Sequence, residues 1–391
     1  MNRVKTIFIC LIASFVMSGF LNPIGLISEP VSQSLGIPIT EAVARFGYFT
    51  VGVFFGYLVS FFVFDFIRLR LVVFFGYGLL MLAVGGLFLF ENDAAMKFFL
   101  FVIGMLASVQ VCGASTLVSS LWRDKPRQTM LIGQDAAFNG GGILFTSLTT
   151  WFIASGFHWG ATYTLVAIIT LIIALVASVT DFKSKSSVYN DLTGRTEWNP
   201  RILAVGGSVM LFMLSKISIF IWAPLYVEQA FDAGIVQAGR ILTNIFIGAF
   251  FGSLLGTYIV SRIRIEYFLI TMLIVGATSL GSMLSSPDLQ LVLTLGYFLG
   301  ASIGATFNGY TSFGLSFVVN PTHKNVAYLL IAGGIGSALA PWFSSEIVKY
   351  GGEIKYVLGV CLLIQCLVLL SVICLILNSW YLEKRLARNE N

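Results

Sequence analysis

Long apolar runs alternate with short polar segments along the whole chain. Each run holds at least 18 mostly apolar residues, enough to cross a hydrocarbon core about 30 Å thick at 1.5 Å per residue. Because backbone polar groups cannot stay unpaired in lipid, each run must be a helix. The pattern predicts an all-α membrane protein with twelve transmembrane helices, at residues 6–27, 43–64, 70–91, 97–120, 129–153, 160–180, 202–226, 237–260, 266–285, 290–318, 325–347 and 354–380.

The chain also divides into two similar halves. Its longest polar segment, 181–201, has the Ser, Asn, Gly and charge content of a linker. A shift of 196 residues places 52–70 on 248–266, and the residues identical to their partners are Gly52, Phe54, Phe55, Gly56, Leu58, Ile67 and Arg68. The same shift places Gly104 on Gly300 and Gly113 on Gly309. We therefore expect an N-terminal six-helix bundle at 1–180, a cytoplasmic linker at 181–201 and a C-terminal six-helix bundle at 202–391, related by duplication.

Composition changes this picture little, but the placement of charge orients the chain. Hydrophobic residues make up 57% of 391 positions and charged residues 10%, against about a quarter in soluble proteins. Of the 23 Lys and Arg residues, seventeen lie in the segments on the side of the termini, five lie on the other side, and Lys216 lies within an apolar run. This bias predicts that both termini are cytoplasmic, in a bacterial-type inner membrane. The net charge of +5 then indicates topology rather than nucleic-acid binding.

Asp135 and Lys216 are the two charges placed well inside apolar runs. A charge at this depth costs a few kcal/mol and tends to survive where it faces a polar path. Asp135 lies about six residues, or roughly 9 Å, into its run, where desolvation favours the protonated carboxyl group and hence proton coupling. Lys216 lies about 14 residues in, where it would hold an anionic solute or form an ion pair. The alternatives are structural roles for both, with Asp135 as a permanently paired acid.

Several uncharged side chains join these two as candidates. Amides bind hydroxylated or zwitterionic solutes, and they also serve as fasteners between helices. An aromatic ring offers a stacking face for a sugar, although most of the aromatic residues here should serve in packing. The candidates for substrate contact besides Lys216 are Asn22, Gln110, Asn139, Asn308 and Trp222. Pro23 and Pro224 should interrupt the first and seventh helices in comparable places, which also points to the binding region.

Two six-helix halves around a central site are the architecture of the major facilitator superfamily, and the loop after the second helix resembles the signature of that superfamily. It reads Asp65-Phe66-Ile67-Arg68-Leu69-Arg70, with an acid and basic residues in place and the family's glycines absent. The resemblance implies that Asp65, Arg68 and Arg70 lock the cytoplasmic ends of the halves. A positively charged loop that only sets topology is the alternative.

Two further segments resemble narrower groups of the superfamily. Phe138-Asn139-Gly140-Gly141-Gly142 is similar to a stretch of the fucose permease-like sugar/proton symporters, as is the glycine-rich run 330–336 followed by Pro341. Over its full length the chain resembles the TsgA-like group, through LGIPITEAVARFGYF, the start of the fifth helix at Asp135, and FIWAPLYVEQAFD. The resemblance implies close packing between the halves at these glycines. The acids that fucose permeases carry in helices 1 and 4 are replaced here by Asn22 and Gln110.

The sequence offers no pattern typical of an enzyme. It has no GxxxxGK phosphate loop, its two histidines lie in predicted loops, and its five cysteines form no CxxC pair. We expect no catalytic residues, no metal and no cofactor.

The combined reading is a monomeric secondary transporter that moves a small polar solute, sugar-like or an organic anion, by alternating access. The proton is the expected coupling ion, the lipid bilayer is the surrounding partner, and no nucleic acid is involved. The alternatives are a proton-driven exporter of drugs or metabolites and a membrane sensor that binds ligand without moving it.

Overall fold

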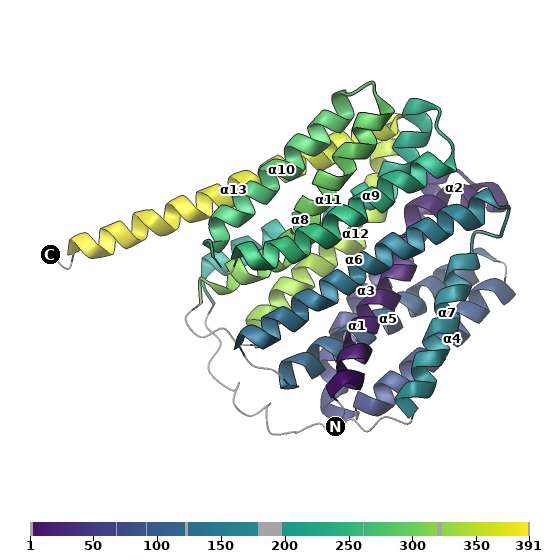
Figure 1. The fold of residues 1–391 in the computed structure, drawn as a ribbon, viewed down its shortest axis with the longest axis horizontal. Coiled ribbons are helices and arrows are strands. Elements are labelled where there is room, and N and C mark those ends of the chain that lie inside the picture. The colour runs from purple at the N-terminus through teal and green to yellow at the C-terminus, as the bar shows by residue number, and fades with distance from the viewer. Residues whose placement is uncertain are drawn as a thin grey trace.

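The computed structural model describes residues 3–67, 69–90, 92–121, 124–178, 198–260, 262–318 and 323–389. Within these ranges the chain is helical, with no strand (Figure 1). The helices are α1 (Arg3–Leu21), α2 (Ile24–Leu35), α3 (Ile39–Phe66), α4 (Leu69–Leu89), α5 (Asp93–Leu121), α6 (Asp124–Ala154), α7 (Ala161–Ser178), α8 (Pro200–Phe231), α9 (Ile235–Val260), α10 (Ile265–Ser285), α11 (Leu289–Leu315), α12 (His323–Gly351) and α13 (Ile354–Asn389).

The first predicted helix is broken in its middle. α1 ends at Leu21, α2 begins at Ile24, and Asn22 and Pro23 form a turn between them. Pro23 has no N–H group, so the carbonyl four residues earlier loses its helical partner. Because 11–35 still forms one apolar span, the helical segments correspond to the twelve predicted crossings. Pro224 does not interrupt its helix, contrary to expectation, because it lies inside the continuous α8.

Local sequence explains where two helices of the C-terminal half begin. The Asn199 side chain accepts a hydrogen bond of 3.0 Å from the backbone N–H of Arg201, and Pro200 follows at the first helical position of α8. Asp288 caps α11 in the same way, accepting from the N–H of Gln290 at 2.9 Å. Such caps satisfy N–H groups that the first helical turn leaves without partners. Both helices therefore start at polar residues outside the apolar run.

The two halves pack equivalent helices with equivalent glycines. A β-carbon on Gly52 of α3 would overlap the carbonyl oxygen of Phe101 on α5, and one on Gly248 of α9 would overlap the carbonyl oxygen of Tyr297 on α11. The shift of 196 residues carries the first contact onto the second. It likewise carries the contact of Gly104 with Phe49 onto that of Gly300 with Ile245. The same close helix approach occurs in both halves, which confirms the predicted repeat.

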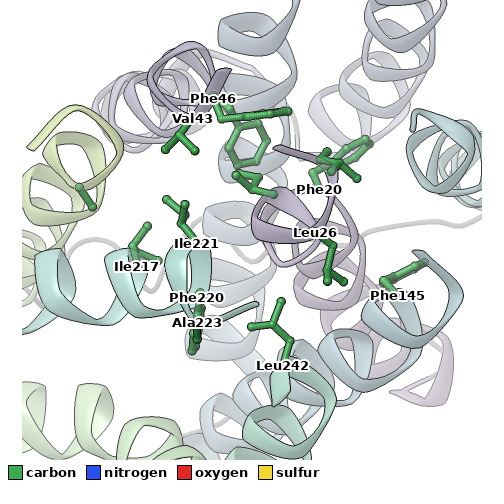
Figure 2. Close-up of a cluster of buried hydrophobic side chains, with 14 of the residues drawn as sticks. Phe20, Leu26, Val43, Phe46, Phe145, Ile217, Phe220, Ile221, Ala223 and Leu242 are labelled. Atoms are coloured by element: carbon green, nitrogen blue, oxygen red, sulfur yellow. The ribbon is translucent and has the colours of Figure 1, made fainter. Parts of the chain in front are cut away.

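The buried apolar side chains form a core that crosses from one half to the other. We call the end of the bundle where α1 begins and α13 ends the terminal end, and the opposite end the distal end (Figure 1). Figure 2 shows part of this core, in which side chains of α8 and α9 meet side chains of α1, α2, α3 and α6. A second cluster, which includes Phe212 and Tyr310, lies within the C-terminal half alone. The shared core joins the halves on the distal side.

Candidate functional site

The first contact zone between the halves is the packing of α6 against α9. From the middle of α6 to its distal end, Asn139 meets Ser253, Gly142 meets Phe246, Thr146 meets Thr243, and Thr150 meets Gly239. The Asn139 amide donates to the Ser253 hydroxyl at 3.2 Å, and the Thr146 and Thr243 hydroxyl oxygens are 3.2 Å apart. The four α6 positions lie three or four residues apart, so they share one face of the helix. This face is the boundary of the N-terminal half.

The second contact zone, α3 against α12, is related to the first by the repeat. The Thr50 hydroxyl donates to the Ala338 carbonyl at 3.3 Å, and a β-carbon on Gly47 would stand 2.6 Å from the Trp342 ring. Under the 196-residue shift, Thr50 corresponds to Phe246 and Ala338 to Gly142. The pseudo-symmetry of the halves therefore extends to the interface between them.

A third contact closes the interface beyond the break in the first span. A β-carbon on Gly25 of α2 would stand 2.6 Å from the carbonyl oxygens of both Phe220 and Ile221 on α8. Only glycine allows two helix backbones to approach so closely. Together with the α6–α9 and α3–α12 zones, this contact seals the distal side.

Asp135 and Lys216 interact electrostatically across the interface. Asp135 lies on α6 of the N-terminal half and Lys216 on α8 of the C-terminal half, and their charges interact. Neither side chain forms a hydrogen bond or a salt bridge within 4.0 Å with any described residue, and both are partly exposed. The structure thus brings the two predicted charges together without pairing them directly. Each remains available to a ligand.

An aromatic pair forms the distal wall beside Lys216. The Lys216 ammonium nitrogen lies 5.7 Å from the ring centroid of Phe220, within the range of a cation–π contact. Phe220 packs against Phe246 with ring centroids 4.9 Å apart, and the Phe246 ring lies against Gly142. Asn22 lies at the same place, because a β-carbon on Gly142 would stand 2.9 Å from its amide nitrogen.

Asn22 has an unsatisfied acceptor at this wall. Its amide nitrogen donates to the Ser18 hydroxyl at 2.6 Å, while its carbonyl oxygen has no hydrogen-bond partner in the described part of the chain. The side chain is only 1% exposed. A buried acceptor without a donor is costly, so this oxygen is poised for a hydroxyl or N–H donor.

Tyr57 is a site residue that the sequence reasoning missed. It lies on α3, is partly exposed, and interacts electrostatically with Asp135. Its ring packs beside α12, where a β-carbon on Gly334 would stand 3.7 Å from it. The repeat carried a usable signal, because the shift that aligns the halves places Tyr57 on Ser253, the partner of Asn139.

Two predicted substrate contacts lie away from the interface. The Gln110 amide donates to the Val72 carbonyl at 3.1 Å, which fastens α5 to α4 inside the N-terminal half. Trp222 is fully buried and lies seven residues after Ser215, whose hydroxyl donates to the Cys361 carbonyl on α13. Residues seven apart share a helix face, so Trp222 lies on the side of α8 toward α13. Neither residue joins Asp135 and Lys216.

The remaining predicted residues lie outside the described structure. Arg68 is outside the described residues altogether. The side chains of Asp65, Arg70 and Asn308 are also outside it, although their backbones belong to α3, α4 and α11. The cytoplasmic gate and the contribution of Asn308 stay predictions.

Asp135 lies deeper in its helix than the apolar run indicated. α6 begins at Asp124, so Asp135 is eleven residues into it, or about 16 Å. The helix extends past the apolar run because Pro126 lies in its first turn, where a missing N–H is tolerated. Asp135 therefore lies well inside α6 rather than near its first turns.

Half of the glycines expected at the interface do lie there. Gly140, Gly142 and Gly334 have their nearest neighbours in the opposite half. The other three, Gly141, Gly333 and Gly336, meet helices of their own half. Adjacent positions on one helix point to different sides, so a glycine run serves both kinds of packing.

No cluster of three or more His, Cys, Asp or Glu side chains suited to a metal occurs among the described residues. The arrangement consists of one cation, one carboxyl group, a phenol and amides on helices of both halves. It is suited to binding rather than bond-making chemistry.

Comparisons with known proteins agree with this architecture. The sequence profile of the Major Facilitator Superfamily matches residues 7–341. The chain is 23% identical over 342 residues to a "Protein TsgA homolog" of Buchnera aphidicola subsp. Baizongia pistaciae, covering 86% of this chain and 87% of that protein. It is 21% identical over 360 residues to "Protein TsgA" of Salmonella arizonae, covering 90% of each.

A solved structure shares the fold at low identity. The crystal structure of a bacterial homolog of the human lysosomal transporter Spinster, in an inward-facing and unoccupied conformation, superposes with a TM-score of 0.68. The two chains are 11% identical, and the match covers 96% of this chain and 95% of the other.

Proposed function

Because this chain belongs to the Major Facilitator Superfamily and is therefore a multi-pass secondary transporter rather than an enzyme, we propose that it moves a small polar solute across the bacterial inner membrane. The solute is sugar-like or an organic anion, and its movement is coupled to protons. The observation that carries this proposal is the electrostatic interaction of Asp135 with Lys216 across the two halves, where neither has a direct partner among the described residues.

The proposed mechanism is alternating access around this pair. Lys216 contacts the solute, and Asp135 takes up and releases the coupling proton as the halves rock. The distal contacts of α2 with α8 and of α6 with α9 support a state closed on that side. The Lys and Arg bias supports a cytoplasmic terminal end, and in this proposal the distal end faces outward and the site opens inward. Asp65, Arg68 and Arg70 would lock the opposite state, and the protein acts as a monomer.

Uptake into proteoliposomes tests the proposal. We expect the wild type to accumulate a polar solute under an inward proton gradient, Lys216→Ala to lose solute binding, and Asp135→Asn to lose accumulation driven by the gradient. Lys349→Ala is the matched control, because Lys349 is an exposed lysine 3.8 Å from Glu346 at the distal end. Unchanged transport and unchanged pH dependence in both site variants would rule out these roles.

An exporter of apolar compounds is the second candidate, favoured by the aromatic lining. Phe54, Phe138 and Phe250 are partly exposed on helices that meet at the interface, in addition to the Phe220–Phe246 pair. Cells that express the protein would then resist several apolar cations. Accumulation of one polar solute without such resistance favours the first proposal.

A further inference from the structure

We propose that the site binds a monovalent anion on Lys216 and one proton on Asp135, so that each transport cycle moves one proton with one anion and no net charge. This inference rests on the proposed function and narrows it to a substrate class and a stoichiometry.

The first support is the unpaired state of both charges. The Lys216 ammonium lies 5.7 Å from the centroid of the Phe220 ring, and it has no hydrogen-bond acceptor among the described residues. The Asp135 carboxyl group has no hydrogen-bond donor among the described residues. Two charges that attract each other but are not joined leave room for a third group between them. A charge held in a poorly hydrated interior also needs a partner of opposite sign.

The second support is the balance of donors and acceptors. Lys216 and the Tyr57 hydroxyl both have donor protons without a described acceptor, and Tyr57 lies in electrostatic contact with Asp135. The Asn139 amide nitrogen is already used on Ser253. An ionised carboxylate or similar anion needs several donors, and this site supplies them. An ammonium ligand would find Asp135 and the Asn22 carbonyl oxygen as acceptors, but it would be repelled by the positive charge of Lys216.

The third support is competition for Lys216. The titratable groups that interact with the Asp135 region are Lys216 on α8, Tyr57 on α3 and, through Tyr57, Cys112 on α5. On α9, the titratable Arg240 and Tyr258 are exposed and lie near the two ends of the helix. Lys216 is thus the one described cation that interacts with Asp135. The ionised carboxylate and the anion compete for it, and protonation of Asp135 ends the competition.

The charge balance follows from this exchange. A proton from the outer solution binds the Asp135 carboxylate and neutralises it. The anion then binds the Lys216 ammonium, and the site as a whole becomes neutral when both are bound. Inside, the anion leaves, the carboxyl group releases its proton, and Asp135 again faces Lys216. The cycle carries one H⁺ and one A⁻ inward.

Proteoliposomes that contain the full chain test this inference. The probes are radiolabelled acetate, lactate and gluconate as monoanions, with succinate, alanine and fucose as dianionic, zwitterionic and neutral comparisons. We expect an inward proton gradient to drive uptake of a monoanion. A membrane potential set by valinomycin and potassium, without a pH gradient, should leave its uptake unchanged.

The variants separate the two roles. Asp135→Asn mimics the protonated carboxyl group, so anion exchange across the membrane should persist and become independent of pH, while accumulation driven by the gradient is lost. Lys216→Gln should weaken anion binding by about tenfold or more, and Lys216→Arg should restore part of it. Size-exclusion profiles that match the wild type confirm that each variant is folded.

Different outcomes would contradict the proposed function and the narrower proposal of electroneutral anion transport. Uptake of fucose or alanine but of no monoanion would overturn the anion assignment and leave the polar-solute transporter standing. Monoanion uptake that responds to membrane potential would overturn the 1:1 stoichiometry. Loss of anion exchange in Asp135→Asn would overturn the competition. Transport that depends on neither residue would overturn the proposed function itself.

Discussion

Gly142 on α6 and Phe246 on α9 touch across the two halves, and a β-carbon at position 142 would stand 2.5 Å from the phenyl ring. Phe246 is fully buried and also packs against the ring of Phe220. The ring therefore has little freedom to move aside. This contact lies between the charged pair and the distal closure, so its size affects both packing and the balance of conformations.

Gly142→Ala should destabilise the distal-closed protein by about 1–3 kcal/mol, because the added methyl group overpacks a closed core. Thermal unfolding in detergent measures the loss. Gly140→Ala is the matched control, since its nearest neighbour, the Phe250 ring, is 3.9 Å away. An equal loss in both variants would show that the contact with Phe246 does not set the cost, because helix propensity alone favours alanine at both positions.

A disulfide across α6 and α9 should lock the distal side. The hydroxyl oxygens of Thr146 and Thr243 are 3.2 Å apart, so Thr146→Cys with Thr243→Cys places two thiols within bonding reach. Oxidation should abolish transport, and reductant should restore it, if the halves must separate there. Cross-linking is followed on gels after cleavage at a protease site inserted within 181–201.

The control pair keeps the cysteine at position 243 and moves the other to a side of α6 that does not face α9. Thr149 bonds to Thr162 of α7 at 2.7 Å, on another side of α6. Thr149→Cys with Thr243→Cys should therefore stay uncross-linked and active. Full transport by the oxidised Thr146–Thr243 pair would contradict alternating access through this zone.

Tyr163→Phe should destabilise the protein by about 1 kcal/mol. The Tyr163 hydroxyl donates to the Phe20 carbonyl at 2.8 Å, next to the break between α1 and α2, and both groups are buried. Removing the donor leaves a buried carbonyl less satisfied. Tyr310→Phe is the control, because its equally buried hydroxyl has no partner among the described residues. The thermal midpoint of Tyr310→Phe should stay unchanged or rise. A fall as large as that of Tyr163→Phe would show that the hydrogen bond to Phe20 is not the cause of the loss.

The repeat makes a paired prediction. Gly52→Ala and Gly248→Ala each place a methyl group onto a carbonyl oxygen of the neighbouring helix, so each should lower stability by about 1–3 kcal/mol. Gly85→Ala on α4 meets nothing within 4 Å and should be neutral or stabilising. Thermal unfolding of the three variants measures these changes in stability. A large loss of stability at only one of the two glycines would show that the close helix contact matters more in one half than in the other.

The sequence by itself determined the twelve spans, the repeat and the two charges inside them. Each polar group that enters lipid costs free energy independently of the others. The lengths of the apolar runs, and the positions of Asp135 and Lys216 within them, can therefore be read directly from the sequence. The break at Pro23 follows from its missing N–H group, and the aligned glycines Gly52 and Gly248 follow from the 196-residue shift.

Only the tertiary structure decided which side chains share the site. A helix in lipid is apolar all round, so its sequence has no strong period that shows which face is inward. Gln110 and Trp222 therefore looked equivalent to Asn139, yet the packed helices turn the first two into their own bundles and the third toward Ser253. The folded bundle also brought Asp135 of α6 into electrostatic interaction with Lys216 of α8. Rotation and depth are set by neighbouring helices, and those contacts exist only in the folded bundle.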